Sequence, residues 1–263
     1  MSAIAKSEEA FLLREDAEGI CTLTLNRPEQ MNLLTSEMLD ALQKAFDAIA
    51  RDKRVRVVIL AAHGRAFSAG HDIKEIRGLQ EEAKIGELFA QCSRMMQAIT
   101  ALPQAVIARV QGVAAAAGCQ LVAQCDLAVA ADTAKFTTPG VSWGFFCSTP
   151  GVAIGRNVSR KRALEMLLTG EPIDARIALE WGLVNRVVTP EALAAETEKL
   201  ARTIAEKPPV QTAAGKRAFY QQMDLGVAKA YELASGVISA SFAHAEGRAG
   251  MDAFLEKKKR PRH

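Results

Sequence analysis

Aromatic residues are scarce in this chain of 263 residues: Phe, Trp and Tyr together make up 5% of it, with two Trp and two Tyr. Hydrophobic residues nevertheless reach 49% and charged residues 24%, which is the composition of an ordinary globular protein. A folded core must therefore be built mainly from small aliphatic side chains. The length is sufficient for one large domain or two small ones.

Long uninterrupted hydrophobic runs are also lacking. No stretch reaches the roughly 18 apolar residues of a membrane-spanning helix. Residues 1–10 have neither the apolar segment of a secretory signal nor the arginines of a transit peptide. The cysteines are odd in number, far apart and without a CxxC pair, which indicates free thiols in a reducing compartment. We therefore expect a cytoplasmic protein that makes no membrane contact.

The chain has no large excess of charge of one sign and no grouping of metal-binding residues. A formal net charge of +3 is too small to indicate nucleic-acid binding over a broad surface. Positive charge gathers only in the C-terminal tail, Lys257 to Arg262, which is too short to support nucleic-acid binding. The histidines do not group with the cysteines at zinc-binding spacing, so no metal site is predicted.

Strand and helix patterns alternate over about two thirds of the chain. Between the strands lie helix patterns, one capped by Thr35 or Ser36 and another stopped by Pro103. From Pro190 onward the pattern is helical only. This order predicts an α/β fold of stacked strand–strand–helix turns over residues 1–195 and a helical C-terminal region over residues 196–263. The strands are predicted at Gly19–Leu25, Val55–Ala61, Ala105–Val110, Asp126–Ala131, Lys135–Thr138 and Leu183–Val188.

A turn made almost entirely of small residues, Ala115–Gln120, follows the predicted strand Ala105–Val110. Small residues let a ligand or another backbone come close. A helix that begins in such a turn directs free N–H groups and the positive end of its dipole into it. The turn is therefore half of a site for a developing negative oxygen, and we expect the segment Ser68–Asp72 to supply the other half.

Several motifs, in the same order along nearly the whole chain, resemble the crotonase (enoyl-CoA hydratase/isomerase) superfamily. The resemblance implies a crotonase-like spiral of ββα turns. It also implies that the C-terminal helical region is an oligomerisation region that assembles homotrimers, or hexamers made of two trimers. The motifs that carry the resemblance are Leu25–Pro28, Phe67–Glu75, Gln111–Leu121, Leu168–Gly170, Gly182–Val184 and Ala253–Lys257.

The same resemblance implies an acyl-CoA thioester substrate and an enolate intermediate, in a lyase or isomerase reaction of fatty acid metabolism. No cofactor is implied apart from the coenzyme A of the substrate. The backbone N–H groups of His71 and Ala117 would polarise the thioester carbonyl, and one such donor is typically worth ~10²–10³ in rate. Coenzyme A would be contacted by Arg27, Ser68, Ala69, Gly70, Asp72 and Ile73, and by Phe254 and Lys257 of a neighbouring subunit.

The chain departs from the family pattern at two catalytic positions. Family members that hydrate enoyl-CoA carry two glutamates there, which hold and activate a water as base and acid. This chain has Gln120 and Gly140 instead. An amide does not accept a proton at neutral pH, although Gln120 can orient a water by hydrogen bonds. A hydratase-like enzyme is the first hypothesis.

Cys147 and Ser148 are candidates for the missing proton donor. A thiol near its reference pKa of about 8.5 is mostly neutral at pH 7 and can act as an acid; the other interpretation of Cys147 is a small residue that fills space in the core. Two alternatives to hydration follow. One is decarboxylation or isomerisation on the same scaffold, because Gly70–Asp72 resembles the methylmalonyl-CoA decarboxylase branch. The other is a homologue that binds acyl-CoA without turnover, because both glutamates are absent.

Overall fold

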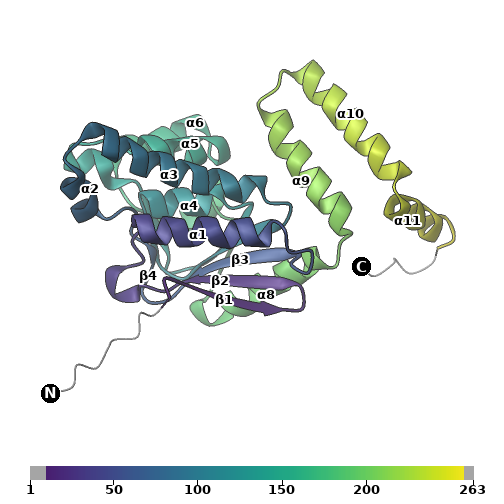
Figure 1. Cartoon of the computed structure of the whole chain (residues 1–263), viewed down its shortest axis with the longest axis horizontal. Coiled ribbons are helices and arrows are strands. Elements are labelled where there is room, and N and C mark those ends of the chain that lie inside the picture. The colour runs from purple at the N-terminus through teal and green to yellow at the C-terminus, as the bar shows by residue number, and fades with distance from the viewer. Residues whose placement is uncertain (1–9, 258–263) are drawn as a thin grey trace.

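The computed structural model describes residues 10–257, and within them it shows an α/β core from which three C-terminal helices project (Figure 1). The core strands form a six-stranded sheet of order β1-β2-β3-β5-β7-β10 and a four-stranded sheet of order β4-β6-β8-β9. The strands are β1 (Leu12–Ala17), β2 (Ile20–Leu25), β3 (Val57–Ala62), β4 (Ala66–Ser68), β5 (Ala105–Val110), β6 (Val113–Ala115), β7 (Leu127–Ala131), β8 (Lys135–Thr137), β9 (Ile173–Asp174) and β10 (Arg186–Val188).

Helices begin and end where the sequence places caps. Thr35 accepts a hydrogen bond from Met38 N–H at the start of α1, and Gly170 and Gly182 end α6 and α7 in the left-handed conformation. The helices are α1 (Ser36–Ile49), α2 (Ile73–Leu79), α3 (Glu82–Ala101), α4 (Ala117–Gln124), α5 (Ser148–Asn157), α6 (Arg160–Thr169), α7 (Ala175–Trp181), α8 (Pro190–Ala205), α9 (Pro209–Met223), α10 (Val227–Ala243) and α11 (Ala245–Leu255), with 3-10 turns η1 (Pro28–Gln30) and η2 (Pro139–Trp143).

From β3 to β8, successive strands alternate between the two sheets, and this alternation winds the chain into a spiral. β3, β5 and β7 lie in the large sheet, whereas β4, β6 and β8 lie in the small one. One or two helices follow each pair of strands. Each turn of the spiral is therefore strand, strand, helix, and the predicted α/β fold is confirmed.

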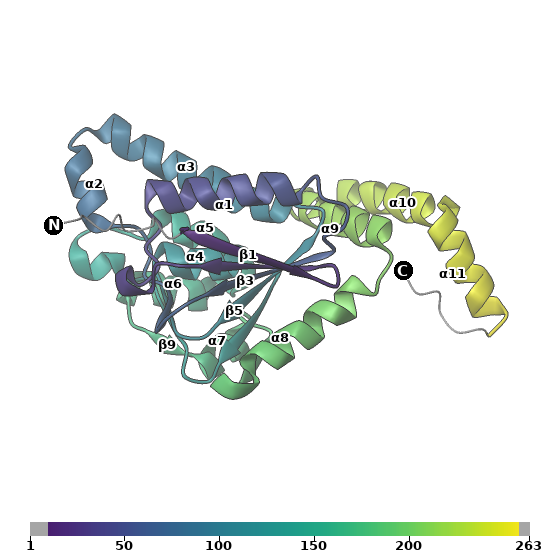
Figure 2. The same cartoon turned by 60° about the horizontal axis from the view of Figure 1, so that its bottom comes forward.

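The large sheet is covered on both faces, which explains why β3 is apolar without alternation. Val58 and Leu60 belong to the main hydrophobic cluster, which includes residues of α1 and α3. Val57 and Ile59 belong to a second cluster with Leu193 of α8. Figure 2 shows α1 and α3 on one side of the strands and α8 on the other.

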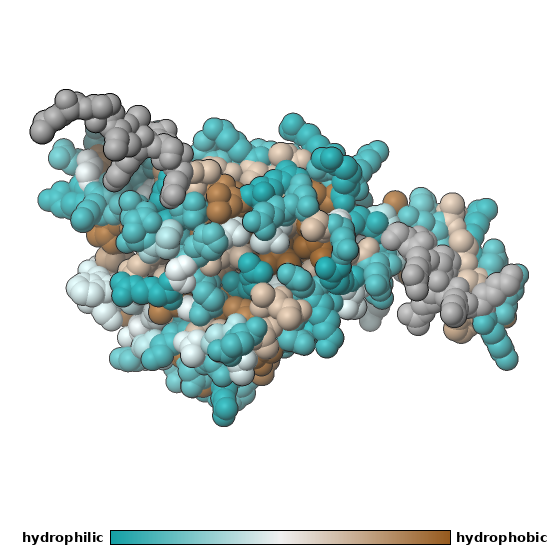
Figure 3. Space-filling model, turned by 90° about the horizontal axis from the view of Figure 1, so that it is seen from below, coloured by the Kyte–Doolittle hydropathy of each residue, from teal (hydrophilic) through white to brown (hydrophobic). Residues whose placement is uncertain are grey.

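The three helices α9, α10 and α11 project from the core in both cartoon views (Figures 1 and 2). In the space-filling view of Figure 3 they form a lobe beside the core on which polar and apolar residues lie side by side. Phe219, Tyr231 and Ile238 are more than half exposed there. The boundary predicted at residue 195 falls within α8, which packs on the large sheet. That the C-terminal helices assemble oligomers stays a prediction.

A buried polar cluster holds α9 to the core. Lys216 Nζ lies 2.7 Å from Asp126 Oδ2, and Tyr220 OH donates to Asp126 Oδ1 over 2.8 Å. Asp126 also accepts from Val106 N–H at the start of β5, over 2.7 Å. One carboxylate therefore joins the sheet to the first projecting helix.

Candidate active site

The turn of small residues connects β6 to α4. The helix after the turn was predicted, whereas the strand that leads into it is β6 and not the predicted Ala105–Val110. Ala116 lies between them with φ 49° and ψ −118°, a conformation that favours glycine. Its N–H donates to Thr137 O over 2.9 Å, and its carbonyl accepts from Gln120 N–H over 3.0 Å. Both polar groups of Ala116 are thus used in holding the turn.

The second half of the site is the loop between β4 and α2. Ser68 Oγ donates to Asn32 O over 2.8 Å and accepts from Gly70 N–H over 3.2 Å. Asp72 caps α2 by accepting from Lys74 N–H over 2.8 Å. Gly70 has φ 91°, so the turn at this position requires a residue without a side chain.

Two glycines let the turn and the loop touch. A Cβ on Gly118 would lie 2.1 Å from Ser68 O, and a Cβ on Gly70 would lie 3.1 Å from Ala117 N. Neither position has room for a side chain. The structure therefore brings Ser68–His71 and Ala115–Gly118 together, as the sequence predicted.

Hydrogen bonds on each side of the contact set the direction of two peptide groups. Gly70 O accepts from Leu34 N–H over 2.8 Å, and Ala116 O accepts from Gln120 N–H. In a trans peptide the N–H points away from the carbonyl, and no peptide bond of the described chain is cis. The N–H groups of His71 and Ala117 therefore point away from these partners, and neither meets an acceptor within residues 10–257.

These two N–H groups can stabilise negative charge. Ala117 is the first residue of α4, where a helix leaves its N–H groups free and its dipole favours an anion. His71 and Ala117 are both buried, so water screens the two donors little. Buried N–H donors of this kind can bind a negatively charged oxygen.

The His71 side chain points to the loop before α1. Its Nδ1 lies 3.1 Å from Leu34 O, and its ring packs edge-on to Phe89 at 5.1 Å between centroids. Nε2 is buried and has no partner in the described chain. Burial lowers the pKa of His71, while the Leu34 carbonyl and the charge of Glu75 act in the opposite direction.

The two positions without the family's glutamates, Gln120 and Gly140, differ in how much room they leave for a side chain. Gln120 is 4% exposed, and its Oε1 has no partner among the described residues. A Cβ on Gly140 would lie 2.8 Å from both Cys147 Sγ and Phe145 O. An amide thus takes the place of the first carboxylate, and neighbouring atoms fill the place of the second.

Cys147 lies beside this second position. Burial raises the pKa of its thiol above the ordinary value, and a hydrogen bond with the backbone of Gly140 opposes the shift. Burial also raises the pKa of Cys119 to about 12, with a further contribution from Cys147. Both thiols are therefore protonated at neutral pH. Ser148 is exposed at the start of α5, and its Oγ donates to Phe146 O over 3.4 Å.

The residues predicted to contact coenzyme A fall into two separate groups. Ser68, Ala69, Gly70, Asp72 and Ile73 form one stretch beside the N–H pair, whereas Phe254 and Lys257 lie on and after α11. Both cartoons show α11 far from α2, which follows the loop (Figures 1 and 2). Arg27 stacks on Phe11 at 4.0 Å. The remaining basic residues of the tail, from 258 onward, lie outside the described residues.

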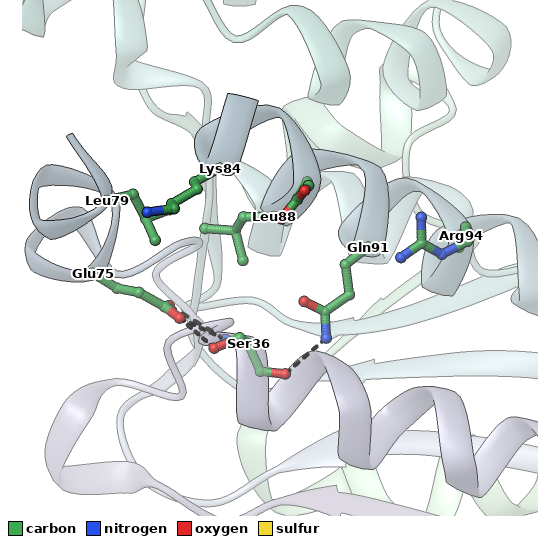
Figure 4. Close-up of a pocket in the computed structure, with 8 residues that line it drawn as sticks. Ser36, Glu75, Leu79, Lys84, Leu88, Gln91 and Arg94 are labelled. Carbon is green, nitrogen blue, oxygen red and sulfur yellow. Dashed lines mark hydrogen bonds between the residues drawn. The ribbon is translucent and has the colours of Figure 1, made fainter. Parts of the chain in front are cut away.

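A pocket of about 460 Å³ lies between α2, α3 and the start of α1 (Figure 4). Ser36 lines the edge formed by α1: its N–H and Oγ donate to the carboxylate of Glu75, and its carbonyl accepts from Gln91 Nε2 over 3.0 Å. These bonds fix α2, and so the loop that precedes it, against α1. The sequence motifs do not point to Leu34, Ser36 or Gln91, because their contacts form only in the folded chain.

The described residues form neither a cluster suited to a metal ion nor a helix suited to spanning a membrane. Residues 10–257 contain no grouping of three or more His, Cys, Asp or Glu that could hold a metal ion. Within the same range, none of the helices has both the length and the apolar character needed to cross a bilayer.

Known proteins are similar to this chain in sequence and fold over most of its length. The family model described as enoyl-CoA hydratase/isomerase matches residues 15–262. The solved enoyl-CoA hydratase of Mycobacterium smegmatis is 49% identical, with a TM-score of 0.95 over 97% of this chain and 100% of that one. The solved human enoyl-CoA hydratase domain-containing protein 3 is 43% identical, with a TM-score of 0.93 over 96% of this chain and 100% of that one.

A curated relative from Xenopus laevis, named enoyl-CoA hydratase domain-containing protein 3, mitochondrial, is 46% identical over 245 residues, which are 93% of this chain and 83% of the relative. Its name contradicts the cytoplasmic location expected from the sequence, and that expectation is wrong. The absence of a leader pattern in residues 1–10 was not a sufficient basis for a location. The family resemblance and the spiral fold are confirmed by the comparisons.

Proposed function

Because the chain belongs to the enoyl-CoA hydratase/isomerase family, we propose that it binds an acyl-CoA thioester and stabilises its enolate form between the N–H groups of His71 and Ala117. The supporting observation is this pair of neighbouring buried N–H groups, whose own peptide carbonyls are already bonded to Leu34 and Gln120. An enolate oxygen carries more negative charge than the parent carbonyl. Two fixed donors therefore bind the enolate more tightly than the neutral thioester.

Acetoacetyl-CoA provides a direct test, because its enolate absorbs in the near ultraviolet and its ionisation can be titrated while it is bound. We expect the protein to lower the apparent pKa of the ligand. Ala117→Pro deletes one donor, and proline is tolerated at the first position of a helix. The variant should lose on the order of 10²-fold of the enolate stabilisation, about two units of ligand pKa.

Two controls accompany this variant: thermal unfolding reports its fold, and calorimetry with free coenzyme A reports the part of the site that does not involve the thioester. An Ala117→Pro protein that is folded and lowers the ligand pKa as much as the parent chain would exclude Ala117 N–H as a donor.

The first candidate reaction is hydration of an enoyl-CoA. Gln120 is the only polar side chain at the two positions where the family resemblance places glutamates, and its buried Oε1 is available to a water. A water held by an amide is less activated than one held by a carboxylate. Crotonyl-CoA, followed by loss of its conjugated absorbance, should therefore be hydrated slowly, and Gln120→Glu should increase the rate. A rate unchanged by Gln120→Glu would contradict a water site at this residue.

Decarboxylation of a malonyl-type thioester is the second candidate, favoured by the protonated thiol of Cys147. The bond between the α-carbon and the carboxylate breaks, carbon dioxide leaves, and the electron pair forms the enolate. The Cys147 thiol then gives its proton to the α-carbon, and water restores the proton on sulfur. Carbon dioxide release should fall in a Cys147→Ala, Ser148→Ala variant and not in Cys21→Ala, a thiol of β2 on another part of the core. Equal rates in all three proteins would exclude these donors.

Enolate stabilisation without product from either thioester would instead identify a protein that binds acyl-CoA without turnover. The absence of both glutamates is the observation that favours this outcome.

A further inference from the structure

Leu34 makes two hydrogen bonds to the loop that carries His71. Its N–H donates to Gly70 O over 2.8 Å, and its carbonyl lies 3.1 Å from His71 Nδ1. A carbonyl only accepts, so Nδ1 is the donor of the second bond. We call this pair of bonds the His71–Leu34 clip. Through the clip, the backbone of Leu34 binds both the carbonyl of Gly70 and the side chain of His71.

The clip acts on the peptide group that supplies one of the two N–H donors. Gly70 O and His71 N–H belong to the same planar unit and point in opposite directions. When Gly70 O faces Leu34, His71 N–H must face away from Leu34. A rotation of this peptide would turn the N–H out of the site.

A specific restraint is needed at this position to prevent the rotation. The peptide turns about ψ of Gly70 and φ of His71, and Gly70, which has φ 91° and no Cβ, hinders rotation about ψ little. The backbone alone therefore does not hold the peptide. The bond from Leu34 N–H to Gly70 O holds it, and the imidazole supports that bond by keeping Leu34 in place through its carbonyl.

The imidazole itself is well held for this purpose. The residue is 9% exposed, and Phe89 packs edge-on against the ring. Burial lowers the pKa of the ring, which keeps Nε2 unprotonated while Nδ1–H serves Leu34. The neighbouring Glu75 is already bonded to Ser36.

We propose that the His71 side chain is a positioning group: through the His71–Leu34 clip it directs the His71 N–H to the thioester oxygen. The catalytic part of the role rests on the proposed function, whereas the clip itself can be measured without ligand. The alternative is that the imidazole acts directly through Nε2 as a proton acceptor.

Two substitutions of matched size separate these roles. Asn in place of His puts an amide N–H near the position of Nδ1 and has no equivalent of Nε2. Leu has the shape of Asn and no donor. The clip should therefore survive in His71→Asn and be lost in His71→Leu. Thermal unfolding confirms that both variants are folded.

The first measurement is hydrogen exchange at Leu34 N–H in the free protein. We expect slow exchange in the parent chain and in His71→Asn, and exchange faster on the order of tenfold in His71→Leu, because the bond to Gly70 O opens more often. Wild-type exchange at Leu34 in His71→Leu would overturn the clip. This result does not depend on any ligand.

The second measurement is the apparent pKa of bound acetoacetyl-CoA. His71→Leu should lose on the order of tenfold of the enolate stabilisation through misplacement of the donor, and His71→Asn should restore most of it. Equal losses in the two variants would overturn positioning in favour of direct action by the imidazole. A parent chain that does not change the ligand pKa would contradict the proposed function, and exchange at Leu34 would still decide the clip.

Discussion

Ala116 is the residue at which the turn of small residues carries backbone strain. A side chain at φ 49° and ψ −118° costs on the order of 1–3 kcal/mol. Two hydrogen bonds, to Thr137 O and from Gln120 N–H, hold the residue in this conformation. The strained peptide is the one that presents Ala117 N–H, so strain and proposed function lie at the same position.

Ala116→Gly should raise the free energy of unfolding by about 1 kcal/mol, because relief of strain exceeds the added freedom of the unfolded chain. The matched control is Ala115→Gly in β6, where φ is not positive and glycine should cost about 0.5–1 kcal/mol. Urea unfolding of both variants should show a higher free energy of unfolding for Ala116→Gly and a lower one for Ala115→Gly. Similar losses in the two proteins would show that Ala116 is not strained.

The family resemblance predicted the His71 and Ala117 pair, because the motifs that carry the resemblance include both halves of the site. The direction of the pair did not, because it depends on Leu34 and Gln120. Leu34 is an apolar residue in a loop, and nothing in its type indicates that both its backbone groups bind the segment 70–71. Such a role becomes visible only when the chain is folded.

At the scale of elements, most buried strands and capped helices were predicted close to their observed bounds, whereas β1, β4, β6 and β9 were missed. β1 contains Arg14, Glu15 and Asp16, a pattern without strand character, and it is a strand because it pairs with β2 across the turn at Gly19. β4, β6 and β9 are two or three residues long, too short for a periodic pattern. Pairing between distant segments decided β4, β6 and β9, and a local hairpin decided β1.

α9 depends on the cluster of Asp126, Lys216 and Tyr220. Burial lowers the pKa of Lys216, and the charge of Asp126 opposes that shift. Asp126→Asn leaves a buried ammonium without its counter-ion and should cost about 3 kcal/mol of stability. Adding Lys216→Met to Asp126→Asn removes that ammonium, so the double variant should lose less than the sum of the single changes.

Chemical unfolding of the single and double variants gives the coupling, and hydrogen exchange in α9 shows where the loss occurs. The exposed pair Lys229–Glu232 of α10 is the control, because breaking it with Glu232→Gln should change little. Additive losses at Asp126 and Lys216 would mean that the two side chains do not stabilise each other.

At the scale of the whole molecule, the buried thiols should make the folded protein less stable at alkaline pH. Burial is the main cause that raises the pKa of Cys21, Cys92 and Cys119 to about 12 each, from an ordinary value of 9.0. Between these pH values the unfolded chain releases protons that the folded chain retains. Stability is therefore full below pH 9 and falls as pH rises toward about 12.

Each of these thiols should contribute a loss of about 1.4 kcal/mol per pH unit in that window. Urea midpoints measured under reducing conditions at neutral and alkaline pH give the total slope. Cys92→Ala removes one thiol and should make the slope shallower by that amount. The same slope with and without Cys92 would show that the thiol ionises equally in both states.

The crowding around Gly140 makes the two positions unequal as targets for engineering. At position 120 a carboxylate needs one substitution, because Glu has the shape of Gln. At position 140 a side chain would place its first carbon 2.8 Å from Cys147 Sγ and from Phe145 O. A second carboxylate therefore requires a change at Cys147 and a shift of the backbone at Phe145 as well.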